Sequence, residues 1–144
     1  MDIFSGEILF RVHRLGRRRR RLLVRSAFTL SAASAAVALL PFRRAIAFGS
    51  VRLGKANRDI VSADCVWAVE TVARHMPWRT VCIEKGIAVQ RLLRKSGIDA
   101  MLHYGARQDA QSGNLEAHVW VTVGESPVIG GEEAKKFSQI AVYP

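Results

Sequence analysis

The sequence contains only two cysteines, Cys65 and Cys82, in 144 residues. So few cysteines cannot build the disulfide framework of a small secreted domain, which favours reduced thiols in a cytoplasmic protein. The two cysteines and four histidines also lack the spacing that ligands show in zinc sites. We therefore expect neither a disulfide nor a metal or other cofactor.

Acidic residues are nearly absent from the N-terminal third. Residues 1–58 contain 13 Lys and Arg against Asp2 and Glu7, a balance of +11, whereas residues 59–144 contain 9 against 10, a balance of −1. The run from Arg17 to Arg21 lacks the interleaved aromatic residues of a nucleic-acid stacking platform, and no nucleic-acid-binding motif accompanies it. These absences argue against a nucleic-acid partner.

A long uninterrupted apolar run is also missing. Between Arg25 and Arg43 there are fewer than the roughly 20 apolar residues that a transmembrane span needs. A secretory or twin-arginine signal would explain residues 45–47 (Ala-Ile-Ala) as a cleavage site. Against it, Arg25 interrupts the apolar region, and Arg43 and Arg44 lie just before the proposed cleavage site. A basic helix on a surface and an Ala/Leu-rich helix packed on the domain stay open, and the packed helix is the simplest interpretation.

The length and a hydrophobic fraction of 49% fit one globular domain with an N-terminal appendage. We place the boundary at the end of a glycine-containing loop, residues 48–58. Residues 1–58 then form a basic, Ala/Leu-rich helical segment and residues 59–144 the domain. Inside the domain, Ser62 is expected to cap a helix over residues 63–75, because valines recur there at helical spacing.

Cys82 falls in the first turn of the next expected helix. Thr80 is suited to cap this helix, which runs to about Lys95, and Gly97 is suited to a left-handed C-cap. In a first turn, unpaired backbone N–H groups and the positive end of the helix dipole favour a thiolate, the reactive form of cysteine. The same N–H groups would stabilise an oxyanion after attack on a carbonyl. Glu84 is expected to face solvent.

Two strands follow this helix. Residues 98–107 alternate imperfectly, and after a polar loop residues 115–123 place valines on one face and His118 with Trp120 on the other. We expect the helix of Cys82 to begin against the face of His118. The two residues are 118 − 82 = 36 positions apart, a separation at which a helix packed on a sheet brings thiol and imidazole together. Such a pair is the core of a cysteine-nucleophile site.

Structural roles compete with these assignments. A cysteine at a helix start serves packing in many proteins, and a strand histidine beside Trp120 can be a satisfied polar residue. Cys65 is expected to be a buried small hydrophobic residue, and His75 to interact with the dipole at the end of its helix. Spacing alone therefore leaves open whether Cys82 and His118 are catalytic or structural.

The segments CIEKGIAVQRLLRKSGIDAMLHYGAR and AHVWVTVGESPVIGG resemble the transglutaminase-like superfamily. The shared pattern is a cysteine that opens a helix, a double leucine, a Gly-Ile pair, a strand, and a His-x-Trp strand. Within the superfamily the chain is most similar to the B2 proteins of lasso peptide biosynthesis, and RRRRRLLVRSAF…LLPFRR resembles their helical N-terminal part. The resemblance implies an α+β fold with a transglutaminase/papain-like core, in which N-terminal helices and a Cys-bearing helix pack on a small antiparallel sheet. It argues against a signal peptide and a membrane span.

The resemblance also assigns the site residues. It makes Cys82 the nucleophile and His118 the base. The family's third, acidic residue lies about a dozen positions beyond the histidine, where this chain has Gly130. Glu132 is the nearest acid downstream and is expected to orient the imidazole, whereas Glu125 is expected in a turn. A carboxylate, an amide or a backbone carbonyl can fill this orienting role.

The function that the resemblance implies is hydrolysis of the bond between leader and core in a ribosomally synthesised lasso peptide precursor. The implied partners are the precursor (leader) peptide, a separate small leader-recognition protein and an ATP-using macrocyclase of the same pathway, without membrane association. The basic N-terminal arm would dock the recognition protein or an acidic leader. Two alternatives stay open: acyl transfer to an amine, as in transglutaminases, and a non-enzymatic basic module associated with membranes or nucleic acid.

Overall fold

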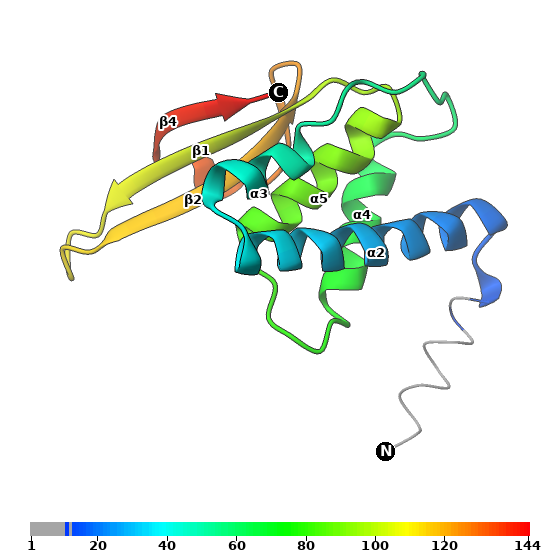
Figure 1. Cartoon of the computed structure of the whole chain (residues 1–144), viewed down its shortest axis with the longest axis horizontal. Coiled ribbons are helices and arrows are strands. Elements are labelled where there is room, and N and C mark those ends of the chain that lie inside the picture. Colours follow the sequence, from blue (N-terminus) through cyan, green and yellow to red (C-terminus); the bar gives the residue numbers. More distant parts are fainter. Residues whose placement is uncertain (1–10, 12) are drawn as a thin grey trace.

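The computed structural model describes residue 11 and residues 13–144, which form a group of helices packed on one antiparallel sheet (Figure 1). The elements are α2 (Arg17–Leu39), α3 (Phe42–Gly49), α4 (Ser62–Ala73), α5 (Cys82–Lys95), β1 (Ala100–Gln108), β2 (Leu115–Val123), β3 (Ser126–Ile129), α6 (Gly131–Ala134) and β4 (Ser138–Tyr143). A Cys-bearing helix packed on a small antiparallel sheet confirms the predicted α+β fold.

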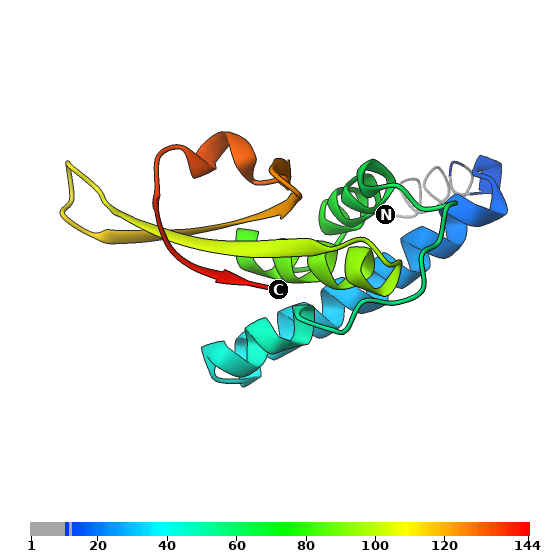
Figure 2. The same ribbon diagram turned by 90° about the horizontal axis from the view of Figure 1, so that it is seen from above.

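A long hairpin of β1 and β2 forms the centre of the sheet, whose strand order is β3-β2-β1-β4. Ala100 pairs with Val123 at one end of the hairpin and Gln108 with Leu115 at the other. β2 has the bounds that its alternating pattern predicts, and β1 begins at Ala100 instead of residue 98. The tip of this hairpin extends well beyond the helices (Figures 1 and 2).

Between β3 and β4 the chain crosses from one edge of the sheet to the other. β3 pairs with residues 121–123 of β2, and β4 pairs with β1 at the opposite edge. The connecting segment, residues 130–137, contains α6 and contacts β2. Figure 2 shows α6 on the opposite side of the β1–β2 hairpin from α5. One face of the sheet is therefore covered by helices and the other, in part, by this segment.

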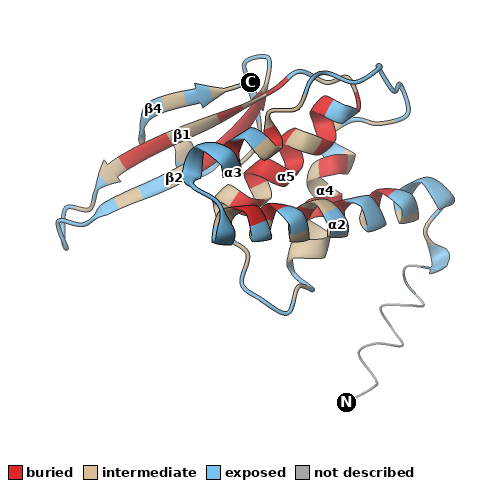
Figure 3. Ribbon diagram, in the orientation of Figure 1, coloured by how far each residue is buried: buried red, intermediate tan, exposed pale blue. Residues whose placement is uncertain are grey.

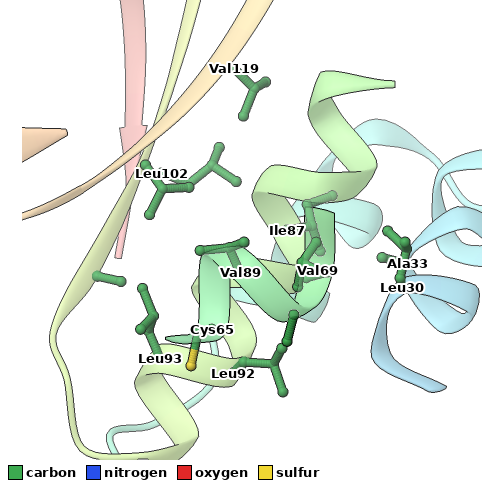
Figure 4. Packing of buried hydrophobic residues seen from close by; sticks show 14 of the residues in the cluster. Leu30, Ala33, Cys65, Val69, Ile87, Val89, Leu92, Leu93, Leu102 and Val119 are labelled. Atoms are coloured by element: carbon green, nitrogen blue, oxygen red, sulfur yellow. The ribbon is translucent and has the colours of Figure 1, made fainter. Parts of the chain in front are cut away.

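α5 is the central helix of the core, with Ile87, Val89, Leu92 and Leu93 all buried (Figure 4). These side chains pack with apolar residues of α2, α4, β1 and β2 into one cluster. Gly86 lets the helix approach the sheet closely, because a Cβ at this position would lie 2.7 Å from Cγ1 of Val119.

The helix starts differ from the sequence expectations. Val81 is the N-cap of α5, so the predicted Thr80 cap is wrong. Glu84 is buried instead of facing solvent, because its carboxylate accepts a hydrogen bond from the N–H of Val81 at 3.0 Å and so completes the helix start. Ser62 begins α4 instead of capping it. At the other end of α5 the C-cap is Ser96, and the next residue, Gly97, has φ of 79° and makes the predicted left-handed end of the helix.

α2 shares this core. Its inner face buries Leu22, Leu30 and Ala33, and the helix contacts both α4 and α5, as the packed-helix interpretation predicts. Figure 3 shows its outer face exposed along the length of the helix. By length and composition α2 is able to cross a membrane, with a mean hydropathy of 1.6, but 33% of that apolar stretch is buried inside the protein. The boundary at residue 58 stays a prediction.

Candidate active site

Cys82 is the first residue of α5 and is partly buried against the core. Because Val81 is the N-cap, the N–H groups of Cys82 and Ile83 have no partner within the helix. The thiol therefore lies, as predicted, at the end of the helix where the dipole and free N–H groups favour negative charge.

His118 is held on β2 through one ring nitrogen. Its Nε2 lies 2.9 Å from the carbonyl oxygen of Gly130. A carbonyl only accepts hydrogen bonds, so Nε2 carries the proton and donates it, and Nδ1 keeps the lone pair in the neutral ring. Within the part of the chain that the structure describes, Nδ1 makes no hydrogen bond. Nδ1 is therefore the nitrogen available as a base.

A row of stacked rings fixes the orientation of His118. Its ring stacks on Trp120, with centroids 6.2 Å apart, and on Phe137, with centroids 5.1 Å apart. Trp120 also stacks on His103 at 5.3 Å, with 6° between the planes. Gly105 makes room for the indole, since a Cβ there would lie 2.8 Å from it. The sequence did not predict this row of rings.

Both ring nitrogens of His103 make hydrogen bonds to side chains on neighbouring strands, on the face of the sheet that carries Trp120. Nδ1 lies 2.7 Å from Oε1 of Gln139 on β4, and Nε2 lies 2.9 Å from Oγ1 of Thr122 on β2. His103 therefore links three strands and supports the indole of Trp120 on which His118 stacks.

Among the described residues, no hydrogen bond joins Cys82 to His118, whose Nε2 lies against Gly130 instead. α5 packs on the valine face of β2, where Gly86 meets Val119. Side chains alternate along a strand, so His118 points to the other face, which residues 130–137 cover. The expectation that α5 begins against the face of His118 is therefore wrong. Its physical reason is that the apolar side of the helix buries the valine stripe, which removes more apolar surface from water.

Gly130 stands where the resemblance predicts an acidic residue, and its backbone carbonyl makes the contact with His118. Its φ of 75° lies in the left-handed region, and a Cβ would lie 2.7 Å from the carbonyl oxygen of Val119 and 3.2 Å from Nε2 of His118. Glu132 is exposed and makes no hydrogen bond to His118 among the described residues, so its orienting role stays a prediction. Glu125 lies in the turn between β2 and β3, as expected.

A second acid near His118 was missed by the sequence analysis. The Lys136 ammonium, 3.0 Å from Glu133, lowers the pKa of that carboxyl, and the charge of Arg107 acts in the same direction. Glu132 and Glu133 both line a surface hollow of about 520 Å³, formed by residues 127–133 and Lys135. Since Gly130 is part of its wall, the hollow adjoins the residue that holds His118.

The other cysteine is structural. Cys65 is fully buried on α4, and burial raises the pKa of its thiol to about 11, which confirms the predicted role as a small hydrophobic residue. His75 lies at the end of the same helix, with Nδ1 2.7 Å from the carbonyl oxygen of Thr71. Among the described residues, no group of three or more His, Cys, Asp or Glu is placed to hold a metal ion.

The fold and these residues define an α+β protein with a cysteine at the start of its central helix and a histidine on its central sheet. The sequence model of the transglutaminase-like superfamily matches residues 8–142, so the chain belongs to the transglutaminase-like superfamily. Cysteine peptidases and acyltransferases occur in this superfamily, whose activity is typically of the cysteine type. No curated protein and no solved structure matches the chain.

Proposed function

We propose that this protein is a cytoplasmic cysteine peptidase that removes the leader peptide from a lasso peptide precursor without a cofactor. The bond between Nε2 of His118 and the Gly130 carbonyl carries the proposal, because it leaves Nδ1 as the ring nitrogen that takes a proton. Membership of the superfamily supports cysteine chemistry at Cys82. The choice of a lasso precursor depends on the resemblance of the segments around these two residues to B2 proteins.

The reaction begins when Nδ1 of His118 removes the thiol proton of Cys82. The thiolate attacks the scissile carbonyl carbon, and the N–H groups of Cys82 and Ile83 at the start of α5 stabilise the oxyanion. The protonated imidazole then gives its proton to the leaving amine as the C–N bond breaks. Water, deprotonated by His118, attacks the resulting thioester, and the free thiol and a carboxylic acid are released.

Attack requires the two side chains to meet, although they come from opposite faces of β2. Both residues lie near the place where α5 touches β2. This contact joins Gly86, one helical turn beyond Cys82, to Val119, the residue after His118. β3 pairs with residues 121–123 of β2, and among the described strands none pairs with the outer edge of β2 beside His118. We propose that substrate binding brings Nδ1 past this edge to Sγ, since catalytic hydrogen bonds are often long or poorly aligned before substrate is bound.

The Gly130 carbonyl replaces the acidic side chain in this proposal. Glu132 keeps a place in it as a wall of the hollow beside Gly130, where a segment of the precursor would lie. A separate small leader-recognition protein would present the precursor, and a macrocyclase would take the released core. The basic residues from Arg17 to Arg21 are not needed for the chemical steps.

The test is cleavage of precursor peptides encoded beside the gene, with any small leader-binding protein present, followed by mass spectrometry. We expect cleavage at one bond, and complete loss of it in Cys82→Ala and His118→Ala. The matched controls are Cys65→Ala and His75→Ala, which change the same residue types away from the site.

Two results would contradict the proposal. Equal cleavage by wild type and Cys82→Ala would exclude Cys82 as the nucleophile. Conversion of an added amine into an amide product, at the expense of hydrolysis, would replace peptidase activity by acyl transfer at the same thioester.

A further inference from the structure

The outer face of α2 carries a continuous exposed stripe that none of the elements formed by residues 13–144 covers. It consists of residues three or four positions apart, all exposed: Arg17, Arg21, Val24, Phe28, Ala32, Ala35 and Leu39. Phe28 is 75% exposed, Leu39 80% and Val24 56%. Single exposed apolar residues are common on proteins, but a stripe of them along one helix marks an interaction surface. Figure 3 shows this face of α2 alternating with the buried inner face.

The apolar part of the stripe is bordered by arginines. Arg17 and Arg21 lie at its N-terminal end, and Arg43 and Arg44, both exposed, follow its C-terminal end in α3. None of these four arginines has an ion-pair partner among the described residues. A hollow of about 450 Å³ at the N-terminal end is lined by Val24 and four arginines: Arg17, Arg20, Arg21 and Arg25. It offers several guanidinium groups to one anionic headgroup.

We propose that the stripe of α2 docks on an anionic phospholipid bilayer. An interfacial helix binds through apolar side chains at the acyl boundary and arginines at the phosphates, and this stripe has both along one face. Phe28 and Leu39 enter the interface while the arginines bind lipid phosphates. This departs from the absence of membrane association that the family resemblance implies, and it does not depend on the proposed peptidase activity.

Two other occupants of the stripe fit the structure less well. A second copy of the chain would bring arginines against arginines in either orientation, because residues 17–44 contain no Asp or Glu. A membrane-spanning α2 would have to leave the core, since its inner face buries Leu22, Leu30 and Ala33 against α4 and α5. A helix that lies flat on the bilayer keeps its inner face packed in the core and buries its exposed apolar side chains in the membrane interface.

The test is co-sedimentation of the full chain with vesicles of phosphatidylcholine alone and of phosphatidylcholine mixed with phosphatidylglycerol. We expect at least about tenfold tighter binding to the anionic vesicles, and release by high salt. The double variant Arg17→Gln/Arg21→Gln and the single variant Phe28→Ser should each weaken binding about fivefold or more. Circular dichroism checks that these surface changes leave the helices intact.

The chain offers a matched control for each variant. Arg52→Gln/Arg58→Gln removes the same charge from an exposed loop, and Leu115→Ser removes an apolar side chain that is 78% exposed on β2. We expect both controls to bind like wild type.

Equal binding to both vesicle types, or no binding, would overturn the proposal, as would controls that lose as much affinity as the stripe variants. Protein that resists salt and is released only by detergent would indicate a spanning helix instead. A dimer in solution that Phe28→Ser dissociates, without vesicle binding, would assign the stripe to a second copy.

Discussion

The variant Gly130→Ala tests whether the left-handed backbone conformation of residue 130 and its contact with β2 require a glycine. The residue has φ of 75°, a conformation that costs a residue with a Cβ about 1–2 kcal/mol. In addition, the new Cβ would lie 2.7 Å from the carbonyl oxygen of Val119, which belongs to β2 and cannot retreat without moving the strand. Overpacking of this kind costs about 1–3 kcal/mol.

Gly113→Ala separates these two contributions. Gly113 has φ of 70°, and nothing lies within 4 Å of the Cβ that alanine would add. It therefore carries the conformational cost alone, partly offset by about 0.4–1 kcal/mol because alanine reduces the entropy of the unfolded chain. We expect Gly130→Ala to be less stable than Gly113→Ala by about 1–3 kcal/mol.

Urea unfolding followed by tryptophan fluorescence measures both free energies of unfolding. The same Gly130→Ala protein should cleave precursor more slowly, because its carbonyl shifts away from Nε2 of His118. Equal destabilisation by the two alanines would refute the reasoning, since it would mean that the contact with Val119 does not constrain residue 130.

Further predictions concern the two cysteines, Glu132 and an ion pair. Burial holds the pKa of Cys65 at about 11, above that of the unfolded thiol. Only the unfolded state therefore ionises as the pH first rises through about 9, and the free energy of unfolding should fall up to about pH 11, a slope that Cys65→Ala should lose. Iodoacetamide at neutral pH should modify Cys82 and spare Cys65; equal modification of the folded protein would contradict activation at the helix start. Glu132→Gln should leave kcat and its pH profile unchanged, and a shifted profile would restore this acid as the orienting group. Arg94→Met should lower the free energy of unfolding in urea by about 1.5–3 kcal/mol, because it removes the guanidinium of a side chain that is 10% exposed and lies 2.5 Å from the Asp99 carboxylate; an unchanged midpoint would contradict this.

The sequence predicts the fold best where one pattern extends over many residues. β2 alternates cleanly over residues 115–123, and the periodic apolar residues of α5 are followed by the left-handed Gly97, so both elements are found where expected. β3 and β4 are short edge strands whose residues are exposed or partly buried, and their sequences carry no clear alternation. Only pairing with β2 and β1 defines them as strands.

The candidate site is predictable in its side chains but not in its backbone. The position of Cys82 in the first turn follows from local sequence, and His118 follows from alternation along β2. Which face of the sheet α5 covers depends on packing of the whole core, and here the prediction was wrong. His118 is held by the backbone carbonyl of Gly130. Every residue has such a carbonyl, so this contact cannot be predicted from the type of residue at position 130.

The strand order has a consequence for the route by which the chain folds. β1 and β2 are joined by a short turn and can pair early, whereas β4 must return to β1 across residues 124–137, and the bond between His103 and Gln139 spans 36 residues. Until β4 arrives, the edge of β1 is an unpaired template open to strands of neighbouring chains. The yield of refolding should therefore fall as protein concentration rises, and a peptide with the sequence of β4 should compete for the same edge.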